Sequence, residues 1–185
     1  RSKHKKACER RVAELHDEEL FKEHPPREEC PICFLPLSLN AGQIAFQSCC
    51  GKRICNGCIH AMMGESCGRG KINLCAFCRV PYPTSDEENI KRMKKLMDAN
   101  KAQAFSQLAR FYVLGIGGLE QDFAEANELF LRAGQLGCHE GYCNLGISYD
   151  NGRGVEVDKK KARYYWELAA MGGDVDARYF LGVTE

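Results

Sequence analysis

The chain has 185 residues, a net charge of +1 and 44% hydrophobic residues, a composition typical of a globular protein rather than a disordered one. No apolar run approaches the roughly 18–20 residues that span a bilayer, and no charged-then-apolar signal opens the chain. The charge is uneven, because residues 30–83 carry a net +4 and residues 104–185 a net −4. A net charge of +4 is too small to indicate binding to nucleic acid.

Residues 1–29 form the first predicted segment. A charged helix is expected over residues 5–23, with Val12, Leu15 and Leu20 loosely on one side and two prolines after its end. We interpret it as a solvated lead-in helix, and a coiled-coil partner is the alternative.

The second segment, residues 30–83, is dominated by cysteine. The chain has 12 cysteines, and nine of them fall between positions 30 and 78. A disulfide framework and a set of metal ligands are the two interpretations. Three C-x2-C pairs favour metal, since a two-residue spacer brings two thiolates to one ion. Thiolate ligands need a reducing compartment, so we expect an intracellular location, cytoplasmic or nuclear.

Eight of these thiolates suffice for two closed zinc sites, because zinc takes four ligands in a tetrahedron and closed sites are structural. The order of the pairs resembles a RING-type zinc finger of the all-cysteine subtype. That family implies a cross-brace in which the first and third pairs share one ion, and the second and fourth pairs share the other. The implied ligands of the two zinc ions are Cys30, Cys33, Cys55 and Cys58 at the first site, and Cys49, Cys50, Cys75 and Cys78 at the second.

Cys49 is the least certain ligand, because adjacent thiolates can meet one ion only if the backbone bends at Gly51. Cys67, in a glycine-rich loop, is the rival for this place, although a spare loop thiol is the simpler interpretation. His60 is a weaker rival and is expected to face solvent. Cys8 stands alone on the first helix and is given no role.

RING domains bind a ubiquitin-conjugating enzyme and orient its thioester-linked ubiquitin, so the contribution of the ligase is positioning. Three family positions match residues of this chain. Ile32 and Pro81 correspond to contacts with the conjugating enzyme, and Arg79 to the cation that orients ubiquitin. Met62 stands where tryptophan is common and offers a smaller apolar contact. The alternative is a non-catalytic zinc-binding adaptor.

Residues 84–103 are predicted to be a helical linker. Ser85 and Glu88 have the spacing of a capping box at the start of a basic, amphipathic helix over about 86–98. We interpret this helix as a connector.

Residues 104–185 repeat with a period near 36, which is typical of a helical solenoid. Tyr112 aligns with Tyr149, and Phe130 with Trp166. A third copy begins at Ala177. Because the chain opens with Arg rather than Met and stops inside a repeat, we expect further sequence outside it.

The consensus from Leu145 to Ala162 closely resembles Sel-one-like repeats, relatives of tetratricopeptide repeats, and implies binding to a protein substrate or scaffold. Asp122 and Asp158 occupy helix N-cap positions. Phe130 and Trp166, at equivalent places, are interpreted as packing residues rather than partner contacts.

Cys138 and Cys143 are interpreted as small packing residues rather than ligands that bind a metal together with His139. The predicted fold is therefore a small zinc-stabilised α+β RING cross-brace domain followed by an all-α helical-repeat solenoid. The predicted function is that of a RING-type ubiquitin-protein ligase.

Overall fold

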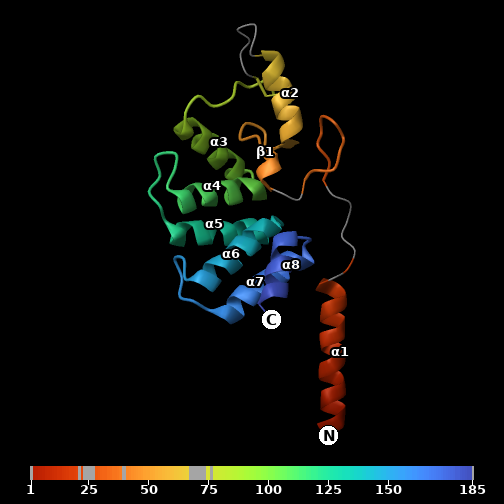
Figure 1. Cartoon of the computed structure of the whole chain (residues 1–185). Helices are drawn as coiled ribbons and strands as arrows, with labels where there is room; N and C mark the ends of the chain where they lie inside the picture. Colours follow the sequence, from red (N-terminus) through yellow and green to blue (C-terminus); the bar gives the residue numbers. More distant parts are fainter. Residues whose placement is uncertain are drawn as a thin grey trace.

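A computed structural model describes residues 2–20, 22, 28–38, 41–66, 74–75 and 77–184. It combines a small cysteine-rich region with a stack of helices, and a separate helix lies to one side (Figure 1). No helix in the described part of the chain is long and apolar enough to cross a membrane.

Two helical hairpins and the first helix of a third build the stack. Its members, each packed on the next, are α4 (Ala102–Leu114), α5 (Phe123–Gln135), α6 (His139–Asn151), α7 (Lys159–Met171) and α8 (Val175–Val183). This arrangement confirms the predicted solenoid and its two-helix period.

Local sequence sets the boundaries of these helices. Asp122 caps α5 by accepting hydrogen bonds from the amides of Ala124 (2.9 Å) and Glu125 (3.0 Å). Asp158 caps α7 in the same way, as the repeat alignment predicts. Glycines in the left-handed region follow α4 and α6 and end both helices.

Small residues let the helices approach closely. Ala126, Ala133, Ala162 and Ala169, at equivalent positions of the two repeats, are all fully buried. A Cβ added to Gly146 would lie 2.5 Å from the ring of Trp166, so α6 and α7 could not pack this closely with a larger residue there.

The first helix, α1 (Ser2–Leu20), ends three residues earlier than predicted. Val12 and Leu15 are exposed, which fits the lead-in interpretation, whereas Leu20 is buried in the cluster around Trp166. The carbonyl of Leu20 accepts a hydrogen bond of 3.0 Å from Arg178 Nη2. The helix is therefore anchored to the stack at its C-terminal end, and the rest of it projects away (Figure 1).

The described residues of the cysteine-rich region form little regular structure. It consists of the 3-10 turn η1 (Ala41–Gln43), the antiparallel strands β1 (Ile44–Phe46) and β2 (Arg53–Cys55), and α2 (Asn56–Ser66). Among the residues described there, the buried members of its core are Cys30, Leu37 and Ile54. A core of this size cannot hold the region together by apolar burial alone.

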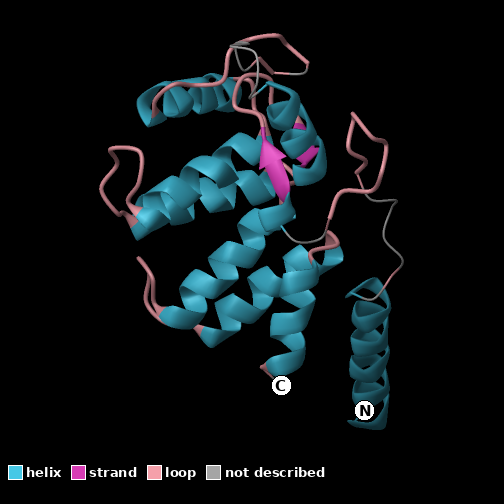
Figure 2. Cartoon of the chain, turned by 45° about the horizontal axis from the view of Figure 1, so that its top comes forward, coloured by secondary structure: helices cyan, strands magenta, loops and turns pink. Residues whose placement is uncertain are grey.

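Helix α3 (Asp86–Asp98) joins the two parts. Ile90 and Met93 on this helix are buried in the same cluster as Leu108 of α4 and Phe130 of α5, and Phe46 of β1 packs against that cluster. The predicted connector thus forms one layer of the helix stack. The strand pair lies where the cysteine-rich region meets this stack (Figure 2).

Candidate metal centres and the helical groove

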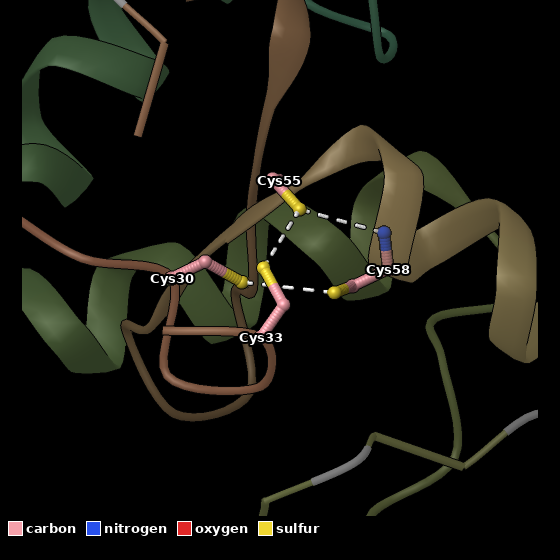
Figure 3. Close-up of side chains that lie close together, drawn as sticks. All are labelled: Cys30, Cys33, Cys55 and Cys58. Atoms are coloured by element: carbon pink, nitrogen blue, oxygen red, sulfur yellow. Dashed lines mark hydrogen bonds between the residues drawn. The ribbon is translucent and has the colours of Figure 1, made fainter. Parts of the chain in front are cut away.

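The first cluster brings together the first and third cysteine pairs. Its sulfur atoms lie 3.9 Å apart between Cys30 and Cys58, and 3.8 Å apart between Cys33 and Cys55. All four lie within 4.8 Å of one another. The sulfurs point toward a common centre from a loop on one side and from the β2–α2 junction on the other (Figure 3).

The second cluster brings together the central and last pairs, Cys49, Cys50, Cys75 and Cys78, whose sulfurs also lie within 4.8 Å of one another. Gly51 follows the adjacent cysteines with a φ of 72°. The carbonyl of Gln47 accepts from the amide of Gly51 at 2.7 Å and from that of Cys50 at 3.2 Å. The backbone therefore bends at the glycine, which is what the convergence of two adjacent thiols requires.

The spacing of these sulfurs fits zinc. Four sulfurs bound tetrahedrally at about 2.3 Å from one zinc ion lie about 3.8 Å from each other. The measured 3.8 Å between Cys50 and Cys75 and the pairs in the first cluster match this edge. A disulfide needs about 2.0 Å, and all eight cysteines are free thiols.

Two turns of nearly identical geometry carry half of these cysteines, at residues 30–35 and 75–80. In each turn the amide of the first cysteine donates to the carbonyl five residues later, at 2.8 and 2.9 Å. The amide of the fifth residue donates back to the carbonyl of that cysteine, at 2.8 and 3.1 Å. Phe34 and Arg79, the fifth residues, adopt φ values of 58° and 59°. Two non-glycine residues therefore adopt this sparsely populated conformation at matching positions of the two turns.

The thiols of one cluster oppose each other's ionisation. Burial acts against the thiolate of Cys30, but hydrogen bonds from the backbone of Cys33 and Cys55 lower its pKa to about 6. Burial and the neighbouring thiols raise the pKa of Cys58 to about 12. The second cluster has the same asymmetry, with a lowered pKa at Cys75 and a raised one at Cys49. A divalent cation would remove this repulsion, because its charge stabilises all four thiolates.

The structure describes only one of the two rival ligands, His60. His60 is exposed on α2 and belongs to neither cluster. Cys67 lies outside the described residues, and the side chain of Cys8 is likewise not described. Cys138 and Cys143 are buried with exposed fractions of 7% and 4%, which supports their interpretation as packing residues.

Three of the four residues predicted to act on the conjugating enzyme or ubiquitin lie in two loops of the cysteine-rich region, and the fourth, Met62, lies on α2. Arg79 and Pro81 are exposed at the second turn. Ile32, in the first turn, is half-buried against the small core. Met62 falls on α2, where its side chain lies outside the described residues.

A groove of about 550 Å³ runs along α4, α6 and the start of α8, and Ile44 and Arg53 of the strand pair line one end. Inside it, Arg110 of α4 pairs with Glu140 of α6 at 3.6 Å. Burial raises the pKa of Glu140, and Arg110 partly offsets this shift. The sequence analysis missed this groove, since its residues come from both parts of the chain and follow no local motif.

Comparison with known proteins identifies the helical part. Residues 100–138 and 139–174 each match the Sel1 repeat family. They therefore form two Sel1 repeats, as the resemblance implies. No RING zinc-finger family matches the chain.

One curated relative is the ERAD-associated E3 ubiquitin-protein ligase component HRD3B of Arabidopsis thaliana, which is 35% identical over 99 residues. The match covers 53% of this chain but only 15% of that protein. A Sel1 repeat protein from Oxalobacter formigenes is similar in structure, with a TM-score of 0.50 and 31% identity over 52% of this chain and 39% of that one. Cysteine rich protein B of Helicobacter pylori shares the fold with a TM-score of 0.50 and 21% identity, over 68% of this chain and 93% of that one.

Proposed function

We propose that this chain, which carries two Sel1 repeats at residues 100–174, is a RING-type ubiquitin-protein ligase. In this proposal the cysteine-rich region binds two zinc ions and recruits a ubiquitin-conjugating enzyme, and the repeats recruit a substrate or scaffold. Reduced thiolates are required throughout, so the proposal also places the protein in the cytoplasm or nucleus.

The observation that carries the proposal is the interleaved order of the two cysteine clusters. The first and third pairs meet, as do the second and fourth. A crossed arrangement holds both loops, residues 30–35 and 75–80, in fixed positions within the same small region. Such a region can present both loops to one partner without a large hydrophobic core, because the zinc ions supply the stability that apolar burial would otherwise give.

The link to ubiquitin has independent support from the relative named as a component of a ubiquitin-protein ligase. Sel1 repeats are consistent with the binding of a protein substrate or scaffold. The groove along α4 and α6 supplies a concave surface for that role, with Arg110 and Glu140 available for polar contacts.

The test of the ligase function is discharge of ubiquitin from a conjugating enzyme. Arg79→Ala should lower the discharge rate about tenfold or more, since hydrogen bonds from a charged donor contribute roughly 1.5–3 kcal/mol each and about 1.4 kcal/mol is a factor of ten. Arg79 is exposed and binds no metal in this proposal, so zinc content should not change. Single-turnover discharge and metal analysis of the same samples measure both quantities.

Ile32→Ala is the matched control. It should weaken recruitment, so that its defect fades at high concentrations of the conjugating enzyme while that of Arg79→Ala persists. If zinc-replete protein gives no discharge above background with any enzyme of a broad panel, the chain is a non-catalytic adaptor. The relative's description as a ligase component is compatible with that second function.

A further inference from the structure

Arg92 on α3 connects the helix stack to the second cysteine loop. Its Nη1 donates a hydrogen bond of 2.6 Å to the carbonyl oxygen of Pro81. Its Nη2 pairs with Glu88 Oε1 at 2.5 Å. Only 16% of the Arg92 side chain is exposed, so this guanidinium is held far more firmly than an ordinary surface arginine.

Glu88 also holds the segment that follows Pro81. Its Oε2 accepts hydrogen bonds from the amide and the hydroxyl of Thr84, at 3.1 and 3.4 Å. The amide of Glu88 donates to Ser85 Oγ at 3.3 Å, which is one half of the predicted capping box. The carboxylate bonds Thr84 and Arg92, and these bonds lower the pKa of Glu88. The chain between Pro81 and Ser85 is therefore held to α3 at both ends.

Helix α3, to which this segment is bonded, is itself packed into the core of the helix stack. Ile90 and Met93, on the turns beside Arg92, are buried in the core shared with α4 and α5. Pro81 in turn forms an antiparallel bridge with Leu74, on the other side of the turn that carries Arg79. The position of this turn is thus set by the helix stack as well as by the cysteines.

We propose that Arg92 is a positioning residue that holds Arg79 and Pro81 in place for the conjugating enzyme. This inference rests on the proposed ligase function. Arg92 touches neither ubiquitin nor the reacting atoms. It acts through the carbonyl of Pro81, because a loop that is already fixed loses less freedom when the complex with the conjugating enzyme forms.

The experiment compares Arg92→Met with three other variants in single-turnover discharge. Arg92→Met should lower the maximal rate about fivefold to tenfold, with both zinc ions retained. Glu88→Gln should cost less than about twofold, since Arg92 can still reach Pro81. Arg163→Met removes another i,i+4 Arg–Glu pair, on α7 (3.0 Å to Glu167), and should leave discharge unchanged.

The decisive variant is the double substitution Arg79→Ala with Arg92→Met. If Arg92 acts by placing Arg79, the maximal rate of the double variant, at saturating conjugating enzyme, should be no lower than that of Arg79→Ala alone. If Arg92 only stabilises the fold, the two substitutions should act independently, so that their losses of discharge rate multiply. That result would overturn the proposal.

Hydrogen exchange separates this inference from the ligase function. In Arg92→Met the amides of residues 77–80 and of Tyr82 should exchange faster, whether or not ubiquitin is discharged. Unchanged exchange there overturns the positioning role. If the wild type discharges no ubiquitin, the ligase function fails, and the role of Arg92 in positioning Arg79 for the conjugating enzyme fails with it, even where faster exchange shows that Arg92 holds the loop.

Discussion

Removal of zinc by a chelator is expected to unfold residues 30–83 while α4 to α8 remain folded. The described part of the cysteine-rich region buries few apolar side chains besides Leu37 and Ile54, and structural zinc supplies on the order of 10–16 kcal/mol to domains of this kind. The repeats have cores of their own around Phe130 and Trp166. Loss of Phe46 from the shared cluster should weaken the stack only slightly.

Two spectroscopic signals distinguish unfolding of the cysteine-rich region from unfolding of the repeats. Far-UV circular dichroism should keep most of its helical signal, and the fluorescence of Trp166, the only tryptophan in the chain, should stay that of a buried ring. Added zinc should restore the part of the circular dichroism signal that the chelator removes, and magnesium should not. If Trp166 becomes exposed at the same chelator concentration, the two parts unfold as one unit. If nothing changes, the fold does not depend on a metal.

Trp166→Ala should destabilise the repeats by about 3–5 kcal/mol, as large-to-small core substitutions do. The ring is 3% exposed and stacks on Phe180 with centroids 5.2 Å apart. It also fills the space over Gly146, so its removal leaves a cavity between α6 and α7.

Thermal and urea unfolding of the variant measure this cost. Lys160→Ala, at an exposed position of the same helix, is the control and should change stability by less than about 0.5 kcal/mol. An unchanged melting temperature for Trp166→Ala, together with lost binding of a partner, would mean that the ring serves contact rather than packing.

The repeats could be predicted from the sequence because their signals are local. Asp122 and Asp158 bond amides two and three residues away, so a cap can be recognised without knowledge of the fold. The alignment of Phe130 with Trp166 correctly predicted two packing residues, since both are almost fully buried.

The cysteines show what their spacing in the sequence can predict and what it cannot. The C-x2-C pairs identify which thiols can share an ion, but which pairs meet depends on how distant segments cross. The family resemblance implied the crossed grouping, and the structure brings the same residues together. Convergence of Cys49 and Cys50 requires a bend at Gly51, and the positive φ of this glycine provides it.

Other features depend on tertiary contacts and had no sequence signal. Arg92 bonds the carbonyl of Pro81 because the second cysteine loop brings that carbonyl to α3. The burial of Met93 in the stack likewise follows from packing against α4. An amphipathic pattern in α3 predicts a buried face without identifying what covers it.

The zinc content of the purified, metal-replete protein tests the central claim most directly. Native mass spectrometry should find two zinc ions per chain, and Cys49→Ser should lose one of them while Cys67→Ser keeps both. One zinc ion or none in the wild type would contradict the two four-thiolate centres. Loss of zinc from Cys67→Ser but not from Cys49→Ser would contradict the ligand set of the second.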